Sequence, residues 1–416
     1  MRRTNKAIFI VICITAVLVL LVGLTWVNYR FSSSIKGGDD FLSYWLGTRL
    51  FLTEGQSAYS EQTTSQVQIM AYGHQARENE ESLIFTSPLY SLIVYAPFAL
   101  IPDLILARSL WMTLVEMAML GIVFFSLKIS NCRSESSGFL LYSLFSFLWY
   151  YSTRALISGD VIIITSFFVV MGIWAVKKGE WEFAGVVFAL STIKPQYAII
   201  LIIILLIWSL SIRKYKFAIW FFSSLTFLIF GTILLQSDWI IQYLRASVQN
   251  LATLNVYNPA TAFSALLPGV GTKIGWSMSG VILALIIIEW IRVRKPDEKK
   301  LVWLIYLTLV GAVFIGLPVE TKSFIMLLPL LPMIFNVIDE RWRKVGVVLN
   351  GAFYVMLLAG IWFIYFSTKG NVNQTAIMFF PAISFLFILM YWIRNWVMNS
   401  VKPWYDIAQE ELKRFR

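Results

Sequence analysis

The sequence predicts an all-α integral membrane protein, a polytopic bundle of transmembrane helices, and three properties of the whole chain carry that prediction. Of its 416 residues, 58% are hydrophobic, and the mean hydropathy is +0.73. A water-soluble domain could not keep so many apolar side chains away from water, because its interior holds only part of the chain. The 17 tryptophans and 18 tyrosines agree with this, since such amphipathic rings favour the headgroup region of a bilayer.

Charge and the scarcity of ligating residues exclude several function classes. The net charge is +11, but the basic residues form short clusters between apolar runs, where the positive-inside rule places them. A nucleic-acid partner is therefore not expected. Cys13 and Cys132 predict neither a disulfide nor a metal site. Because His74 is the single histidine, a His-rich metal centre is excluded.

The chain begins with a transmembrane helix expected over residues 7–29. Residues 7–27 are almost wholly apolar, which makes a run of about 20 residues, long enough to cross the hydrocarbon core. A signal peptide would have a shorter apolar core and a small-residue cleavage site. We therefore expect this helix to be uncleaved, with its start in the cytoplasm.

Residues 30–87 form a long polar segment, expected as an extracytoplasmic loop that carries function. Two amphipathic helices are expected in it, lying in the plane of the membrane. The first would bury one face made of Phe41, Tyr44, Trp45, Thr48 and Leu52, and the weaker second one a face made of Val67, Met70 and Ala71.

A helical bundle is expected over residues 88–397, followed by a cytoplasmic tail at 398–416. The hydrophobic segments lie at 88–127, 138–155, 160–176, 181–194, 196–212, 215–235, 273–293, 301–317, 322–338, 345–366 and 376–397. Connections rich in Lys and Arg alternate with others, which requires an odd number of crossings within 88–127. One span plus a short or re-entrant helix there gives about twelve crossings in all. Residues 1–416 are then a single membrane domain with both termini in the cytoplasm.

Two of these segments are unusually short and meet at Lys194-Pro195-Gln196. A proline flanked by polar groups inside hydrophobic sequence leaves backbone groups that need partners at depth. Lys194 is therefore expected to line a polar cavity rather than to face lipid.

Acidic residues near the outer surface are the candidates for acid–base chemistry. Asp39 and Asp40 follow the first helix, and one of them could act as a general base toward a sugar hydroxyl. Capping of the following amphipathic helix explains either residue as well, and the local pattern favours the cap. Asp160 follows Gly159 at a helix start, where capping is again the simple explanation. Glu320 could simply pair with Lys322.

Four basic residues are expected on the outer side, where they could stabilise a phosphate leaving group. They are Arg154, Lys194, Arg245 and Lys322. For Arg154 and Lys322 the commoner fate is snorkelling from a helix end to the headgroups. Arg245 lies in an amide-rich stretch that could bind sugar hydroxyls or form an ordinary polar loop. His74 is interpreted as a solvated loop residue.

The sequence contains no Walker-A pattern and no Rossmann fingerprint. No soluble segment is long enough to bind a nucleotide sugar. Any group donor is therefore expected to reach the site from the membrane.

Several motifs, taken in order, resemble glycosyltransferase family 87. Asp40-Phe41, Tyr44, Gly55 and Tyr59 resemble the opening of that family, and the run from Phe85 to Leu89 resembles its Tyr-Pro-Pro segment. They are followed by Pro97, Pro102, Trp111, Lys194-Pro195-Gln196 and the basic cluster Arg213-Lys214-Tyr215-Lys216. The similarity covers roughly residues 35–335. Gly159-Asp160 stands where members often have Gly-Gln, and residues 317–322 lack the family's late His.

The resemblance implies a GT-C type fold and an inverting glycosyltransferase that uses a polyprenyl-phosphate sugar. Carried over, the role of the base falls on Asp40, with Asp39 as second choice. From their charge and expected position, Lys194, Lys322, Arg245 and Arg154 are the candidates to bind the donor phosphate. Asp160, Gln196, Glu320 and Tyr44 are possible substrate contacts.

The expected reaction moves a mannose- or arabinose-like sugar to a lipid or glycan acceptor on the extracytoplasmic face of the plasma or inner membrane. No cofactor is implied, and a divalent metal stays open. The alternatives are a transporter or flippase for envelope glycolipids, for which no internal repeat is found, and a non-catalytic assembly protein.

Overall fold

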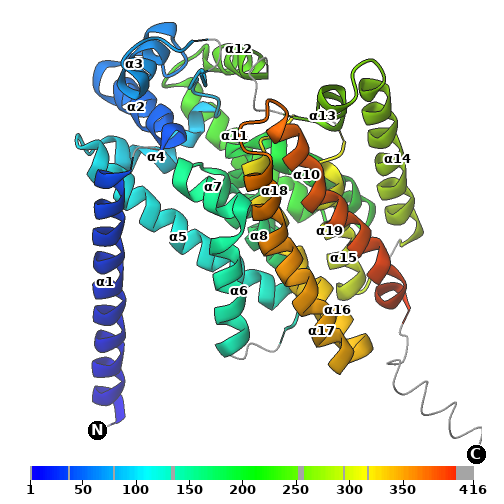
Figure 1. Ribbon diagram of the computed structural model, residues 1–416. Helices are drawn as coiled ribbons and strands as arrows, with labels where there is room; N and C mark the ends of the chain where they lie inside the picture. Colours follow the sequence, from blue (N-terminus) through cyan, green and yellow to red (C-terminus); the bar gives the residue numbers. More distant parts are fainter. Residues whose placement is uncertain are drawn as a thin grey trace, which may run out of the picture. The chain divides into compact units, whose positions relative to one another are not determined.

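The computed structural model describes residues 2–35, 38–77, 80–132, 136–251, 257–293, 296–315 and 318–399 (Figure 1). Within these ranges the regular elements are helices, apart from one isolated β-bridge between Tyr257 and Val319. By their internal contacts the residues separate into two compact units, each described by itself. Unit 1 comprises Met1–Ala118, Leu156–Val161 and Gln236–Asn250, and unit 2 the remainder. Most of the expected cytoplasmic tail lies outside the described residues.

Unit 1 begins with a long apolar helix that is attached to its unit near one end. Its elements are α1 (Arg2–Ser34), α2 (Asp39–Glu54), α3 (Glu61–Tyr72), η1 (Leu89–Ser91), α4 (Leu92–Ala99), the start of α5 (Leu104–Ile129) and α12 (Trp239–Leu251). The Asn28 amide of α1 donates to Glu116 Oε2 (2.8 Å) and Thr113 Oγ1 (3.1 Å) of α5. From Val11 onward, most apolar side chains of α1 are exposed. The expected first helix is confirmed, and its open surface suits lipid contact.

The two helices expected in the polar segment are present as α2 and α3 (Figure 1). Four of the five residues predicted to share the buried face of α2 are buried, whereas Leu52 is 43% exposed. On α3, Val67 is buried but Met70 is exposed. The prediction was therefore wrong at Leu52 and Met70.

Residues 88–127 form one short helix followed by one long helix, as expected. The short helix α4 ends at Ala99, and α2 supplies partners for its last carbonyl groups. Trp45 Nε1 donates to Phe98 O (3.0 Å), and Arg49 Nη1 donates to Ala99 O (2.9 Å). The final carbonyls of a helix have no partner within the helix, so these side chains let α4 stop inside a packed structure.

Unit 2 is built around α15 (Glu298–Ala312), which is buried on all sides from Leu301 to Gly311. A helix that is apolar all round belongs in the core of its unit. The other elements are α6 (Ser136–Leu148), α7 (Tyr150–Ser158), α8 (Ile162–Lys178), α9 (Trp181–Leu190), η2 (Ser191–Ile193), α10 (Pro195–Ser211), α11 (Tyr215–Ile233), α13 (Pro259–Leu266), α14 (Gly271–Arg292), η3 (Thr321–Leu327), α16 (Leu330–Trp342), α17 (Lys344–Val355), η4 (Met356–Gly360), α18 (Ile361–Ser367) and α19 (Gln374–Met398). The segment expected over 138–155 is broken at Trp149, which separates α6 from α7.

Glycines allow close helix contacts in unit 2. A Cβ on Gly185 of α9 would meet the Phe217 carbonyl oxygen of α11 at 2.6 Å, and one on Gly275 of α14 would meet the backbone of Ala260 in α13 at 2.4 Å. Small residues permit this approach, which is common where helices pack within a membrane. A bidentate ion pair, Arg394 to Glu289 (2.9 and 3.0 Å), joins α19 to α14.

Several helices are long and apolar enough to make this a multi-pass membrane protein. Among the described residues, six helices are long and apolar enough to cross a membrane. The number is seven if the pair Thr321–Leu327 and Leu330–Trp342, bent by 46°, counts as one span. Four shorter apolar helices accompany them: Leu89–Ala99, Gly138–Leu148, Trp181–Ile193 and Pro195–Ser211. The number of about twelve crossings and the GT-C type of fold stay predictions.

We expect Gly159→Ala to destabilise unit 1 by about 2–5 kcal/mol, the sum of left-handed strain and overpacking. Gly159 has a φ of +72°, and a Cβ there would meet Phe41 Cβ at 2.7 Å. Gly55→Ala is the control, because Gly55 has a similar φ of +69° with no atom within 4 Å of the added Cβ. The apparent Tm of the detergent-purified variants, followed by tryptophan fluorescence, should fall further for Gly159→Ala. Equal losses would show that the contact with Phe41 carries no weight.

Candidate functional site

The first turn of α2 carries the two carboxylates expected after the first helix. The N-cap position belongs to Gly38, whose φ of +83° is left-handed, so the expectation that Asp39 or Asp40 provides the cap is wrong. Both residues instead lie in the first helical turn, where the helix dipole favours negative charge. Asp39 is exposed and Asp40 is half-buried. The two adjacent carboxylates therefore have different surroundings.

Asp40 has a second carboxylate beside it within unit 1. Oxygens of Asp40 and Asp160 lie within 4.8 Å of each other, and Asp160 is fully buried. Two like charges at this distance repel each other, and a proton, a cation or a bound hydroxyl close by offsets that repulsion. Two carboxylates alone are fewer ligands than Mg²⁺ or Ca²⁺ takes, so this pair by itself defines no complete metal site. It is a place where a hydroxyl hydrogen could be accepted.

Two side chains of α5 contact the segments that carry these carboxylates. Trp111 is fully buried, stacks on Phe41 at 5.5 Å between ring centroids, and donates from Nε1 to Gly159 O (2.9 Å). Arg108 is 5% exposed and donates from Nη1 to Ile35 O (3.0 Å) and from Nη2 to Ile157 O (3.4 Å). Sequence reasoning missed Arg108. An arginine inside an apolar helix was the available signal.

An aromatic cluster lies against the carboxylate pair. Tyr44 stacks on Tyr95 at 4.9 Å, and its hydroxyl lies 3.3 Å from Thr86 Oγ1. Burial is the main cause that raises the pKa of Tyr95, and Tyr44, Asp160 and Asp40 add smaller contributions. Tyr44 is 3% exposed, so it belongs to the packed core beside the carboxylates. Its role as a substrate contact stays a prediction.

A tyrosine of the same cluster fixes the connection between α2 and α3. The Tyr59 hydroxyl donates to Ser87 O (2.7 Å), and its ring packs edge-on against Phe85. Burial raises the pKa of Tyr59 well above its usual value, with smaller contributions from neighbouring tyrosines. The phenol is therefore protonated at neutral pH and acts as a permanent donor.

Arg245 lies on α12, a helix where sequence analysis left an ordinary polar loop open. That alternative is wrong for residues 239–251, which form a helix. Amide side chains of this stretch bind neighbouring groups. The Ser57 hydroxyl donates to Gln242 Oε1 (2.5 Å) and accepts from Gln236 Nε2 (3.0 Å). The hydrogen bond from Gln242 lowers the pKa of Asp238, whose carboxylate also feels the charge of Arg245. Arg245 itself is exposed.

In unit 2, Lys194 lies at the expected break between two short helices. The 3-10 turn Ser191–Ile193 precedes it, and α10 begins with Pro195. Lys194 is 3% exposed, and its Nζ lies 5.9 Å from the ring centre of Tyr197. The broken helix is confirmed. Because the ammonium is buried, Lys194 is not a residue that reaches from a helix end to the headgroups.

The remaining candidates of unit 2 fall in two places. Glu320 and Lys322 form an ion pair (2.5 Å), as the simple interpretation expected. Gln196 lines a small cavity of about 20 Å³ together with Val319 and Ser323, so the turn after Lys194 lies beside the segment that carries Glu320 and Lys322. Arg154 is exposed on α7.

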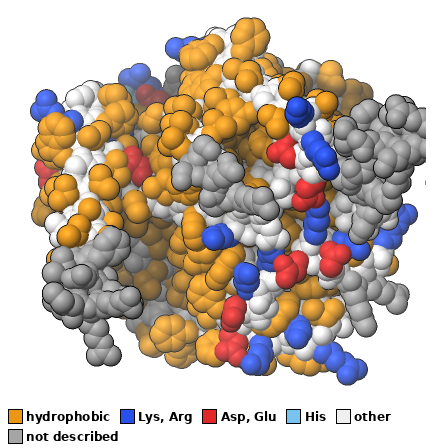
Figure 2. Space-filling model, turned by 90° about the horizontal axis from the view of Figure 1, so that it is seen from below, with side chains coloured by type: hydrophobic (Ala, Val, Ile, Leu, Met, Phe, Trp, Pro, Cys, Tyr) orange, Lys and Arg blue, Asp and Glu red, His pale blue; other side chains and the backbone are white. Residues whose placement is uncertain are grey.

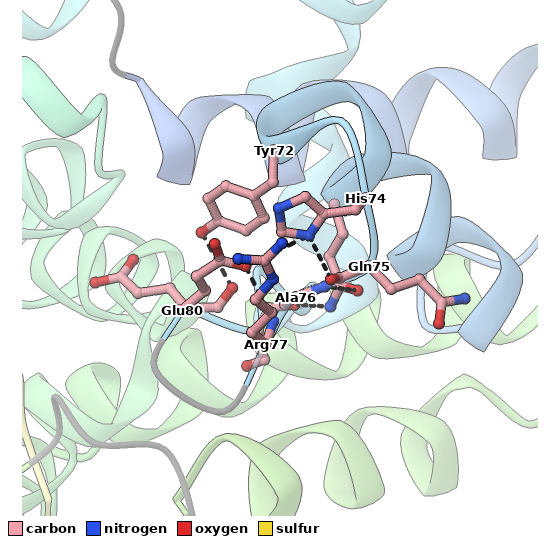
Figure 3. Close-up of polar contacts among 9 residues, drawn as sticks. Tyr72, His74, Gln75, Ala76, Arg77 and Glu80 are labelled. Atoms are coloured by element: carbon pink, nitrogen blue, oxygen red, sulfur yellow. Dashed lines mark hydrogen bonds and ion pairs between the residues drawn. The ribbon is translucent and has the colours of Figure 1, made fainter.

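His74 lies in a loop, as expected, directly after Gly73 ends α3. Figure 3 shows its surroundings: the Nδ1 atom lies 2.8 Å from Gln75 O and 3.7 Å from Glu80 Oε2. The Tyr72 hydroxyl donates to Glu81 O, and burial together with nearby acidic groups raises the pKa of Tyr72 to about 12. These contacts form a local network among the described residues that follow α3.

A larger cavity, of about 660 Å³, lies elsewhere in unit 2. Its charged lining residues are Lys177, Glu298, Lys299, Asp339 and Glu340. Four of these residues form two ion pairs: Lys299 with Glu340 (2.5 Å) and Lys177 with Glu298 (3.9 Å). Figure 2 shows a face of the molecule on which basic and acidic side chains are similarly interspersed. None of the predicted site residues lines this cavity.

Comparison with known proteins decides the class. The model of glycosyltransferase family 87 matches residues 85–319, more than half of the chain. The chain belongs to glycosyltransferase family 87. No curated protein and no solved structure shows a significant match. The match confirms the family resemblance that the sequence motifs indicated.

The matched region divides the candidate residues of the glycosyltransferase. It includes Asp160, Lys194 and Gln196, together with Arg154 and Arg245. It begins after Asp39, Asp40 and Tyr44, and it ends one residue before Glu320. The roles of the residues outside the match therefore depend on their positions in the structure and on the motifs quoted above.

We expect Ser57→Ala to loosen α12, because it removes both hydrogen bonds to Gln242 and Gln236. The cost should be about 1–2 kcal/mol. Hydrogen exchange of amides 239–250 should then accelerate several-fold. Ser65→Ala is the control, since Ser65 accepts a hydrogen bond only from the loop residue Gln75. Unchanged exchange in α12 would mean that other contacts fix the helix and Arg245.

Proposed function

We propose that this glycosyltransferase moves a sugar, with inversion of configuration, from a polyprenyl-phosphate donor to a lipid or glycan acceptor on the extracytoplasmic face. The observation that carries the proposal is the placement of Asp40 beside the buried Asp160, at the start of a helix in the polar segment that follows the first long apolar helix. Membership of family 87 supplies the reaction class. The carboxylate pair supplies the base that such a reaction needs.

In the proposed reaction Asp40 removes the proton of an acceptor hydroxyl. The oxygen attacks the anomeric carbon from the face opposite the phosphate, a new glycosidic bond forms, and the bond from the anomeric carbon to the phosphate oxygen breaks. The polyprenyl phosphate leaves with the electron pair of that bond. Asp160 adds negative charge beside Asp40, which favours transfer of the proton to the pair.

Lys194 is proposed to bind the phosphate of the donor. A buried ammonium at a helix break is held in place, and it stabilises the charge that grows on the departing phosphate more strongly than a solvated one. Lys322, Arg245 and Arg154 are proposed as further phosphate contacts.

The donor is proposed to arrive through the lipid phase. The sequence has no nucleotide-binding fingerprint. The helices of both units expose large apolar side chains, so the lipid bilayer suits both this protein and a polyprenyl chain. A mannose- or arabinose-like sugar and a cytoplasmic position of both termini complete the proposal. The transporter alternative loses its support, because family 87 is a family of glycosyltransferases.

We expect Asp40→Asn to lower kcat about 10²- to 10⁴-fold, because the amide cannot accept the acceptor proton. Asp39→Asn is the matched control: it makes the same change one residue earlier, at an exposed position, and should change kcat much less. The assay uses purified protein in nanodiscs, with synthetic polyprenyl-phosphate mannose or arabinose as donor and a polar lipid extract as acceptor.

Three results would contradict this assignment. If Asp39→Asn abolished transfer while Asp40→Asn preserved it, the base would be Asp39. If neither variant affected transfer, the carboxylate mechanism would be wrong. Turnover with a nucleotide sugar alone would reject the lipid-phosphate donor.

We expect Lys194→Met to lower kcat about 10²- to 10³-fold by removing the charge that faces the leaving phosphate. Lys194→Arg keeps that charge in a different shape and should retain more activity than Lys194→Met. Initial rates over a range of donor concentrations separate kcat from KM. Equal losses in both variants would indicate that packing at the helix break, and not charge, is what Lys194 provides.

A further inference from the structure

We propose that Arg108 and Trp111 are positioning residues that hold Asp40 and Asp160 at their mutual distance. The inference rests on the proposed function of Asp40. The two residues are one turn apart on α5 and therefore lie on the same face of the helix. Each of them contacts both of the segments that carry the carboxylates, and these segments are far apart in the sequence.

Arg108 binds the backbone a few residues before each of the two carboxylates. Its guanidinium donates to Ile35 O before the first carboxylate and to Ile157 O before the second. Gly38 packs directly against it, since a Cβ on Gly38 would meet Arg108 Nε at 2.6 Å. The short path from Ile157 to Asp160 and the turn from Gly38 to Asp40 are thus both set by one side chain.

Trp111 makes a second pair of contacts to the same two segments. Its ring stacks on Phe41, the residue after the first carboxylate, and its N–H binds Gly159 O, the residue before the second. Tyr95 and Phe98 pack on its other sides at 5.2 and 5.3 Å. A fully buried ring with neighbours on every side has one orientation, so it transmits that orientation to both segments.

Stability alone does not account for an arginine at position 108. Burying a guanidinium costs free energy, and an apolar side chain of similar volume is often equally good or better for stability. What the guanidinium adds is a planar fork that fixes two carbonyl groups in direction as well as distance. Such definition matters for a proton acceptor, because a misplacement of about 1 Å can cost a hundredfold in rate.

A double-mutant cycle tests the proposal in the same nanodisc assay. Arg108→Lys keeps the charge but loses the fork, and we expect kcat to fall about 10- to 100-fold while KM for polyprenyl-phosphate mannose changes less than threefold. In the Asp40→Asn background the same substitution should leave the residual rate unchanged, because it acts through Asp40. Arg49→Lys is the control, since Arg49 also donates to a main-chain carbonyl of unit 1, at Ala99.

Trp111→Phe provides a second variant with a milder change. The phenyl ring keeps the stack on Phe41 but lacks the donor to Gly159 O, and kcat should fall about 10-fold. In the Asp40→Asn background, Trp111→Phe should leave the residual rate unchanged. This variant keeps the proposal testable if Arg108→Lys does not fold.

A readout without substrate separates this inference from the proposed function. In Arg108→Lys, amides 38–42 and 157–161 should exchange several-fold faster, with no change in α12. Unchanged exchange in both segments would overturn the proposal, as would equal rate losses of Arg108→Lys in the presence and absence of Asp40. If Asp40→Asn retained full activity while exchange increased as expected, the positioning would stand and the assignment of the base would fall.

Discussion

The contact of Trp111 with Phe41 and Gly159 is the constraint on which the rest of unit 1 depends. One indole ring touches the first turn of α2 and the turn before α8, and it also packs against α4. Because the ring is fully buried, none of these segments can shift without opening a cavity or breaking a hydrogen bond. This packing holds the backbone segments that carry Asp40 and Asp160.

Some of the buried charge in this apolar chain lies at two kinds of place. Arg394 and Glu289 satisfy each other in a bidentate pair between two helices, which is a structural solution. Asp160 and Lys194 lie instead where helices stop. A helix end exposes backbone N–H and carbonyl groups, so a polar side chain there has polar surroundings even at depth. The helix breaks therefore give these buried charged side chains polar surroundings.

The family and the composition place the same requirement on the reaction. A glycosyltransferase needs a base and a stabilised leaving group, and we propose that Asp40 and Lys194 provide them in this chain. A donor that carries its own lipid anchor fits a protein whose surface is largely apolar. In the proposed mechanism the protein excludes water and holds its catalytic groups in fixed positions.

The sequence by itself determined the membrane class, the first helix, the two helices of the polar segment, the break at Lys194 and the family. Each of these depends on local information: hydrophobic run length, helical periodicity, proline chemistry or ordered motifs. The tertiary structure decided that Asp160 lies beside Asp40, that Arg108 binds two distant carbonyl groups, that Gly38 takes the cap and that residues 239–251 form a helix. These depend on contacts between segments far apart in the chain, and no local pattern encodes which neighbours will meet.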